Sequence, residues 1–100
     1  MYIAVTRFAG SFGPLMAEFV VGHLVADQRQ FFELAEDQKA KKWDHEQRGN
    51  YRPLSSLSIG ILGVGEIGRE IARVCKQGFG MRVLGLGADV CVALILNSKI

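Results

Sequence analysis

The sequence predicts an α/β fold in which one long helix precedes a single βαβ unit of a parallel sheet. Apolar residues recur at helical spacing over about residues 15–41. Two apolar runs, at residues 57–62 and 81–86, flank a helix-like stretch that ends near Gln77, and a glycine-rich turn joins the first run to that stretch. One hundred residues, of which 49% are hydrophobic, suffice for one small domain or for part of a larger one.

The first expected element is the long helix. Pro14 suits the first helical position after a cap at Gly13, and a cluster of lysines gathers toward the opposite end, where cations favour the helix dipole. We therefore expect one helix over about residues 15–41. Its apolar face, which includes Phe31 and Phe32, is wide for a lone helix on so small a protein, and this width predicts a partner surface.

Residues 43–53 break the helical period and predict a loop or an extended arm. Pro53 biases Arg52 away from the helical conformation. Basic residues interleave with Trp43 and Tyr51, a pattern that superficially resembles a nucleic-acid-binding patch. Acidic residues nearby dilute the charge, and the net charge of the chain is only +2. We favour a solvated loop or a subunit contact, and expect no nucleic-acid partner.

The first strand, expected at residues 54–62, leads into a GxGxxG turn that opens the next helix. In this context, inside a βαβ unit of about 30 residues, the motif is typical of dinucleotide binding by a Rossmann-type, doubly wound parallel sheet. Gly63 would make the tight turn, Gly65 would let the backbone approach a pyrophosphate, and Gly68 would let the helix pack on the strand. The candidate cofactor-binding residues of this turn are Gly63, Val64, Gly65, Glu66, Ile67 and Gly68.

The N–H groups around Gly65 to Ile67 would face the phosphates, with the positive end of the helix dipole behind them. We therefore expect the turn to bind phosphate without a cationic side chain, and its six residues include none. The alternative is a glycine-rich turn in an ordinary βαβ unit.

Other residue patterns argue against metal, redox and membrane functions. Cys75 and Cys91 lack metal-ligand or redox spacing, and His23 and His45 have no neighbouring ligands. Cys75 is expected to be a small buried hydrophobe. The uncharged run at residues 90–96 is too short for a membrane span of about 20 residues and predicts a buried strand. Without a signal-peptide pattern, we expect a reduced, cytoplasmic protein with no membrane partner.

Taken in order, these elements resemble the D-isomer-specific 2-hydroxyacid dehydrogenase family, and within it the glyoxylate and hydroxypyruvate reductases. The resemblance covers residues 5 to about 87. The residues that carry it are Val5-Thr6-Arg7, Ala17 to Val21, Gln38 to Trp43, Tyr51 to Leu54, Ile59 to Gly68 with Ala72, and Gly80 to Val83. It implies a nicotinamide dinucleotide, NAD or NADP, as cofactor, reduction of a 2-oxo acid to a D-2-hydroxy acid by hydride transfer, and a homodimer interface formed by the arm.

The same resemblance implies that the chain is a fragment. Residues 1–13 would end a linker from a missing substrate domain, residues 14–53 would form an interdomain and dimerisation helix with its arm, and residues 54–100 would begin a truncated dinucleotide-binding domain. The family's catalytic arginine, glutamate and histidine lie downstream of the matched residues, so no catalytic residue is assigned, and the chain alone would at most bind nucleotide.

Two rival interpretations stay open at this stage. In the first, the chain is a non-catalytic interaction fragment that pairs with a full-length relative through its long helix and arm. In the second, it belongs to a different dinucleotide enzyme.

Cofactor choice in such domains depends on the residue just beyond the second strand. Here that place holds Leu86-Gly87-Ala88 and no acid, while Asp89 comes a residue or two late. If Asp89 reaches the ribose hydroxyls it favours NAD, and if it is only a turn aspartate the site accepts NADP equally. Asp89 is therefore a further candidate cofactor-binding residue, and both cofactors stay open.

Overall fold

A computed structural model of the chain describes residues 2–87. Asp89 and the strand expected at residues 90–96 lie outside the described residues. The described elements, in chain order, are α1 (Gly13–Gln28), α2 (Phe31–Lys39), α3 (His45–Arg48), a 3-10 turn (Leu54–Ser56), β1 (Ser58–Leu62), α4 (Glu66–Arg73), a π-helical turn (Val74–Gly78) and β2 (Arg82–Leu86).

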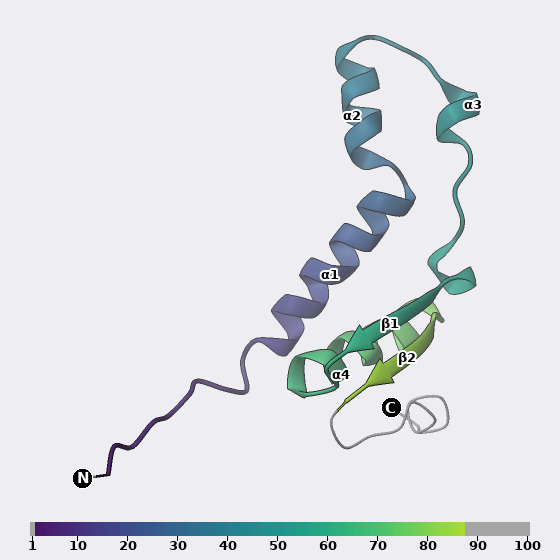
Figure 1. Cartoon of the computed structure of the whole chain (residues 1–100). Coiled ribbons are helices and arrows are strands. Elements are labelled where there is room, and N and C mark those ends of the chain that lie inside the picture. Colours follow the sequence, from purple (N-terminus) through teal and green to yellow (C-terminus); the bar gives the residue numbers. More distant parts are fainter. Residues whose placement is uncertain (1, 88–100) are drawn as a thin grey trace.

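The predicted βαβ unit is confirmed. β1 and β2 pair in parallel, in register from Ser58 opposite Arg82 to Leu62 opposite Leu86, and α4 with its π-helical turn connects them (Figure 1). The first strand, however, begins at Ser58 rather than at residue 54. The reason is local, since the N–H and the hydroxyl of Ser56 both donate to the carbonyl oxygen of Pro53, at 3.0 and 2.9 Å, and fold this part of the apolar run into a turn.

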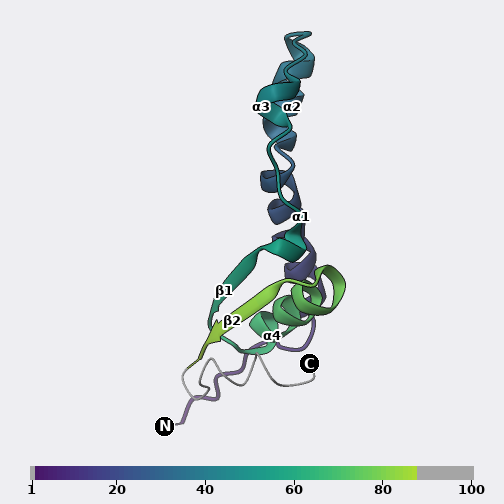
Figure 2. The same ribbon diagram turned by 90° about the vertical axis from the view of Figure 1, so that its right-hand side faces the viewer.

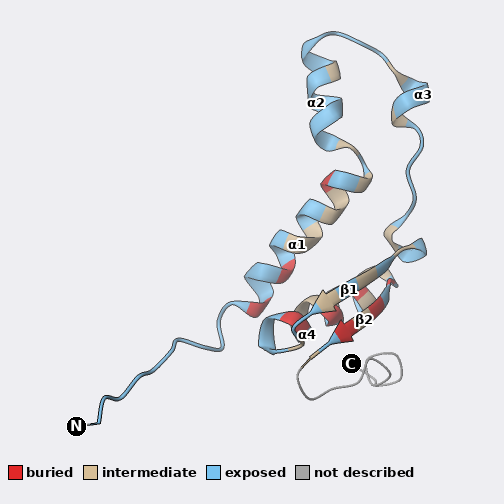
Figure 3. Ribbon diagram, in the orientation of Figure 1, coloured by how far each residue is buried: buried red, intermediate tan, exposed pale blue. Residues whose placement is uncertain are grey.

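The buried core lies between α4 and one face of the sheet (Figure 3). Its fully buried members are Ala72, Cys75, Met81 and Val83, against which half-buried side chains from α1, including Val21 and Leu24, also pack. The expected burial of Cys75 is confirmed, and desolvation raises the pKa of its thiol. Because α1 packs along α4, the helix that follows the glycine loop is supported by the sheet on one side and by α1 on the other.

Alternate residues of the strands face away from that core. Leu62 and Leu86, which pair in register, are 85% and 55% exposed on the opposite face of the sheet. Parallel sheets are usually covered on both faces. Within residues 2–87 the sheet is therefore covered on one face and largely open on the other.

The single helix expected over residues 15–41 is wrong, because the structure contains two helices separated by a break. α1 ends at Gln28, and Gln30 adopts a left-handed conformation with φ of 55° before α2 begins. The break is held from the returning chain: the Arg29 guanidinium carbon lies 4.1 Å from the centroid of the Tyr51 ring, and Arg48 Nη1 donates to Gln30 Oε1 at 3.3 Å. The start of the helix is close to that expected, with Phe12 as the cap and Pro14 in the first turn.

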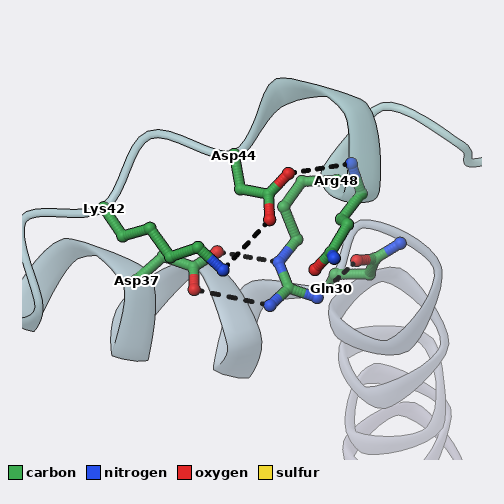
Figure 4. Close-up of polar contacts among 6 residues, drawn as sticks. Gln30, Asp37, Lys42, Asp44 and Arg48 are labelled. Carbon is green, nitrogen blue, oxygen red and sulfur yellow. Dashed lines mark hydrogen bonds and ion pairs between the residues drawn. The ribbon is translucent and has the colours of Figure 1, made fainter.

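From here on the arm denotes residues 31–53, which comprise α2, α3 and the segments that follow each of them, and it projects from the βαβ unit (Figures 1 and 2). Residues 43–53, expected as a loop or an extended arm, contain the short helix α3. Polar side chains join its two sides (Figure 4). Arg48 Nε donates to Asp37 Oδ2 at 2.8 Å, and Asp44 accepts from Lys42 and from the N–H of Gln47, both at 3.1 Å. These contacts hold the pKa of Asp37, mainly through Arg48, and that of Asp44, mainly through Gln47, below the usual value.

Candidate glycine-loop site

The glycine loop joins the carboxyl end of β1 to the N-terminus of α4 (Figure 1). Gly63 has φ of +95°, a left-handed conformation that L side chains rarely adopt, so the expected tight turn is confirmed. The N–H of Gly63 donates to the carbonyl oxygen of Leu86 at 2.7 Å. This bond continues the pairing of the strands by one residue and fixes the loop to the end of β2.

Gly68 permits close packing of α4 on the loop. A Cβ built at this position would clash with the carbonyl oxygen of Gly63 and would lie 3.3 Å from Cγ2 of Ile61. The predicted packing role of Gly68 is therefore confirmed. Ala72, one turn further along α4, is also buried and continues the small surface.

Gly65 differs from Gly68, because a Cβ at Gly65 would meet no protein atom within 4 Å. It caps α4 without a side-chain hydrogen bond, so the first N–H groups of α4 receive no capping side chain within the described residues. Gly65, Glu66, Ile67 and Gly68 line a cavity of about 280 Å³. Open space above bare backbone donors at a helix N-terminus is the arrangement that a pyrophosphate needs, so these residues fit a dinucleotide.

The far side of this cavity is formed by the N-terminal segment, residues 7–12. Arg7, Phe8, Ala9 and Phe12 line it opposite the glycine loop. A cation is therefore present at the site, although the turn itself holds none and none was expected there. The available signal in the sequence was the Val5-Thr6-Arg7 string within the resemblance, to which no binding role had been attached.

Val64 lies where the loop approaches the end of β2. A Cβ built at Gly87 would be 3.7 Å from the Cβ of Val64. The end of β2, where the choice of cofactor is expected to be made, is thus adjacent to the glycine loop. Asp89, the residue proposed from the sequence for that choice, lies outside the described residues.

The exposed face of α4 beside the loop carries an ion pair. Arg73 Nη2 lies 2.6 Å from Glu70 Oε1, and this hydrogen bond lowers the pKa of the Glu70 carboxyl. In residues 2–87 no group of three or more His, Cys, Asp or Glu side chains could hold a metal ion. None of the helices in that same range is long and apolar enough to cross a membrane.

Comparison with known proteins identifies the family. The sequence model described as "D-isomer specific 2-hydroxyacid dehydrogenase, NAD binding domain" matches residues 21–90. The chain belongs to this family. The matched residues include the whole βαβ unit and the glycine loop, so the 2-hydroxyacid dehydrogenase resemblance and the partial Rossmann fold are confirmed. The match favours the dehydrogenase interpretation over a non-catalytic interaction fragment.

Curated relatives match only part of their length. D-3-phosphoglycerate dehydrogenases of Rattus norvegicus and Homo sapiens are 38% and 35% identical to this chain over 69 residues. Those residues are 69% of this chain and 13% of each relative. The chain thus spans a small part of the curated D-3-phosphoglycerate dehydrogenases that it matches.

Solved structures show the same fold. A D-isomer specific 2-hydroxyacid dehydrogenase family protein from Aeromonas salmonicida is 44% identical with a TM-score of 0.70, over 78% of this chain and 24% of that one. An NADPH-dependent glyoxylate/hydroxypyruvate reductase from Sinorhizobium meliloti, solved with NADP and sulfate, has a TM-score of 0.72 over 86% of this chain and 26% of that one. The latter is 23% identical and supports the fold alone.

Proposed function

We propose that the glycine loop between β1 and α4 binds the pyrophosphate of a nicotinamide dinucleotide. In this proposal the chain supplies the nucleotide-binding part of an oxidoreductase that reduces a 2-oxo acid to a D-2-hydroxy acid by hydride transfer. The observation that carries it is a contrast between two glycines of the motif. A Cβ at Gly68 would clash with protein atoms, whereas a Cβ at Gly65 would lie in open space at a helix end that has no capping side chain. Family membership supplies the identity of the ligand.

Each residue of the loop has a separate part in this proposal. Gly65 keeps the approach free of a side chain, and the N–H groups of Glu66 and Ile67 donate to phosphate oxygens. Val64 lies beside the end of β2, on the side expected for the adenosine ribose. The bound dinucleotide would supply the hydride. No residue of this chain is assigned a catalytic role, so the chain alone binds nucleotide without reducing an acid.

A glycine replacement tests the loop directly. Gly65→Val should raise the dissociation constant for NADH at least about tenfold, because the side chain fills the space that the pyrophosphate needs. The matched control is Gly22→Val in α1, where a Cβ also meets nothing within 4 Å. Isothermal titration of both variants, with circular dichroism to check their folding, gives the comparison. Equal binding by the two variants would refute the loop as the pyrophosphate site.

The cofactor preference is proposed to rest on Asp89. A carboxylate there would accept hydrogen bonds from the ribose hydroxyls of NADH and repel the 2′-phosphate of NADPH. Asp89→Asn should therefore bring the two dissociation constants closer together. A ratio of the two constants that stays the same in the variant would remove Asp89 from the site.

The arm is proposed to form a homodimer interface. Phe31 and Phe32 on α2 are 51% and 66% exposed, and Trp43 beyond α2 is 91% exposed. Large apolar side chains exposed together mark interaction surfaces, and a second copy of the chain is the proposed occupant. Trp43→Ser should shift sedimentation equilibrium toward the monomer, whereas Tyr2→Ser, at a fully exposed aromatic outside the arm, should not. A monomeric parent chain at micromolar concentration would overturn the proposal.

A cytoplasmic location is proposed from the cysteines. Two cysteines without metal or redox spacing favour a reducing compartment, and the structure has Cys75 as a free, buried thiol. Fractionation of source cells, followed by mass spectrometry for peptides of this chain, tests the location. Recovery in a membrane or secreted fraction would contradict it.

A further inference from the structure

Arg7 occupies an unusual position for a cation. It lines the glycine-loop cavity from the side opposite Gly65 and Glu66. Over residues 2–87 its guanidinium takes part in no ion pair and no side-chain hydrogen bond. An exposed arginine beside a cavity lined by bare backbone donors has its full hydrogen-bonding capacity available to a ligand.

The segment that carries Arg7 continues directly into α1, which packs on α4. The rings of Phe8 and Phe12 meet edge to face, with centroids 5.7 Å apart. The carbonyl oxygen of Phe12 accepts from the N–H of Met16 at 2.9 Å, which joins the segment to α1. Gly13 then packs on α4, since a Cβ built there would lie 3.3 Å from the Cβ of Glu70. Arg7 thus lies a few residues before the point where the chain packs on α4, the helix whose N-terminus lines the same cavity.

The charges around the cavity favour such a cation. A pyrophosphate in a dinucleotide carries two negative charges, whereas a helix N-terminus supplies the equivalent of roughly half a positive charge. The carboxylate of Glu66 lines the same cavity and adds a repulsive charge. Arg69 lines the neighbouring pocket with Gly65 and Glu66. A cation in the N-terminal segment would add to the attraction for a dianion from the other element that lines the cavity.

We infer that Arg7 binds the pyrophosphate of the dinucleotide, donating from its guanidinium to phosphate oxygens opposite the N–H groups of the glycine loop. The planar fork of arginine suits two oxygens at once. This inference rests on the proposed function and adds a residue from the N-terminal segment to the site. The carboxylate of a 2-oxo acid is the other anion that could reach the same guanidinium, and the test separates the two.

The test uses ADP-ribose, which contains the pyrophosphate but neither nicotinamide nor a 2-oxo acid. Arg7→Met in the full chain should raise its dissociation constant about fivefold at low salt, as expected for loss of a partly solvated charge-assisted hydrogen bond. Arg7→Lys should restore part of the loss. The matched control, Arg82→Met, removes the same charge at the opposite end of β2 and should leave the constant unchanged.

Further variants and salt sharpen the outcome. Glu66→Gln should tighten ADP-ribose binding, and the effect of Arg7→Met should shrink as salt rises from 0.05 to about 0.5 M, because screening weakens the contact. If ADP-ribose binds equally well to the parent chain and to Arg7→Met, Arg7 does not contact the pyrophosphate. If Gly65→Val has lost binding while Arg7→Met has not, the proposed function stands and this inference fails. If the parent chain binds neither ADP-ribose nor NADH, both fail.

Discussion

The βαβ unit and the arm are stabilised by different kinds of contact. In the βαβ unit, apolar side chains from α4 and β2 are buried together with Met81, while glycines allow the backbones to approach closely. In the arm, α2 and α3 contain no buried residue. Arg48 and Asp37 join its two sides through a partly buried hydrogen bond, and Asp44 holds the turn through bonds to nearby residues. The βαβ unit, which holds the candidate site, is stabilised by apolar burial. The arm is held by polar contacts, and its apolar side chains stay exposed in the described chain.

The largest expected effect comes from breaking the close approach in the βαβ unit. Gly68→Val should destabilise the chain by about 3 kcal/mol, because the new side chain clashes with the backbone of Gly63. Gly60→Val is the matched control, since a Cβ at Gly60 in β1 meets nothing within 4 Å. Urea unfolding followed by circular dichroism measures both. A similar loss in the two variants would mean that the strand–helix contact is not tight.

A second, smaller effect should separate the arm from the βαβ unit by pH. The hydrogen bonds from Arg48 and Gln47 hold the pKa values of Asp37 and Asp44 below the usual range. Their contribution to stability is therefore complete above the unfolded value, about 3.9, and is lost as the pH falls through the lowered values. Hydrogen exchange measured from pH 6 down to pH 2.5, corrected for intrinsic rates, should show arm amides losing protection first.

Arg48→Met provides the control for that titration. With Arg48 removed, Asp37 loses the main cause of its lowered pKa, so the arm should already be less protected at pH 6 and should change less on acidification. Loss of protection in β1 and β2 at the same pH as in the arm would contradict the view that the two regions respond separately.

The smallest effect concerns the break between α1 and α2. Tyr51→Leu removes the ring beneath the Arg29 guanidinium and should cost about 0.5 kcal/mol, as for an exposed cation–π contact. The residues around Gln30 should then exchange faster, while the glycine loop keeps its nucleotide affinity. Thermal unfolding and exchange rates measure the change. A large fall in NADH affinity would instead indicate that the break helps to position the site.

The sequence predicted the βαβ unit well because its determinants are local. Gly63 and Gly68 are required by a turn and a close approach among residues only a few positions apart. The two apolar runs then place the strands on either side of the loop. The start expected for the first strand, residue 54, is too early. Leu54 belongs to the apolar run, but the N–H of Ser56 donates to the carbonyl oxygen of Pro53, so this part of the run forms a turn.

The break in the long helix and the position of Arg7 could not be predicted in the same way. The helical spacing of apolar residues continues through Gln30, so the sequence shows no sign of the break. The side chains that hold the break, Arg48 and Tyr51, come from later residues of the arm. Arg7 lies in a segment without any period, and it reaches the glycine loop only because α1 packs along α4. Both features depend on contacts between residues that are distant in the chain.

The bond from the N–H of Gly63 to the carbonyl oxygen of Leu86 makes one mechanical unit of the glycine loop and the end of the second strand. A substitution that shifts the end of β2, for example to exchange one nicotinamide cofactor for the other, pulls on the backbone of the loop as well. In the proposed site, selectivity at the ribose and affinity for the pyrophosphate would therefore be coupled through this backbone contact. On that proposal, a redesign of the cofactor preference that breaks the contact would weaken the binding of both cofactors at once.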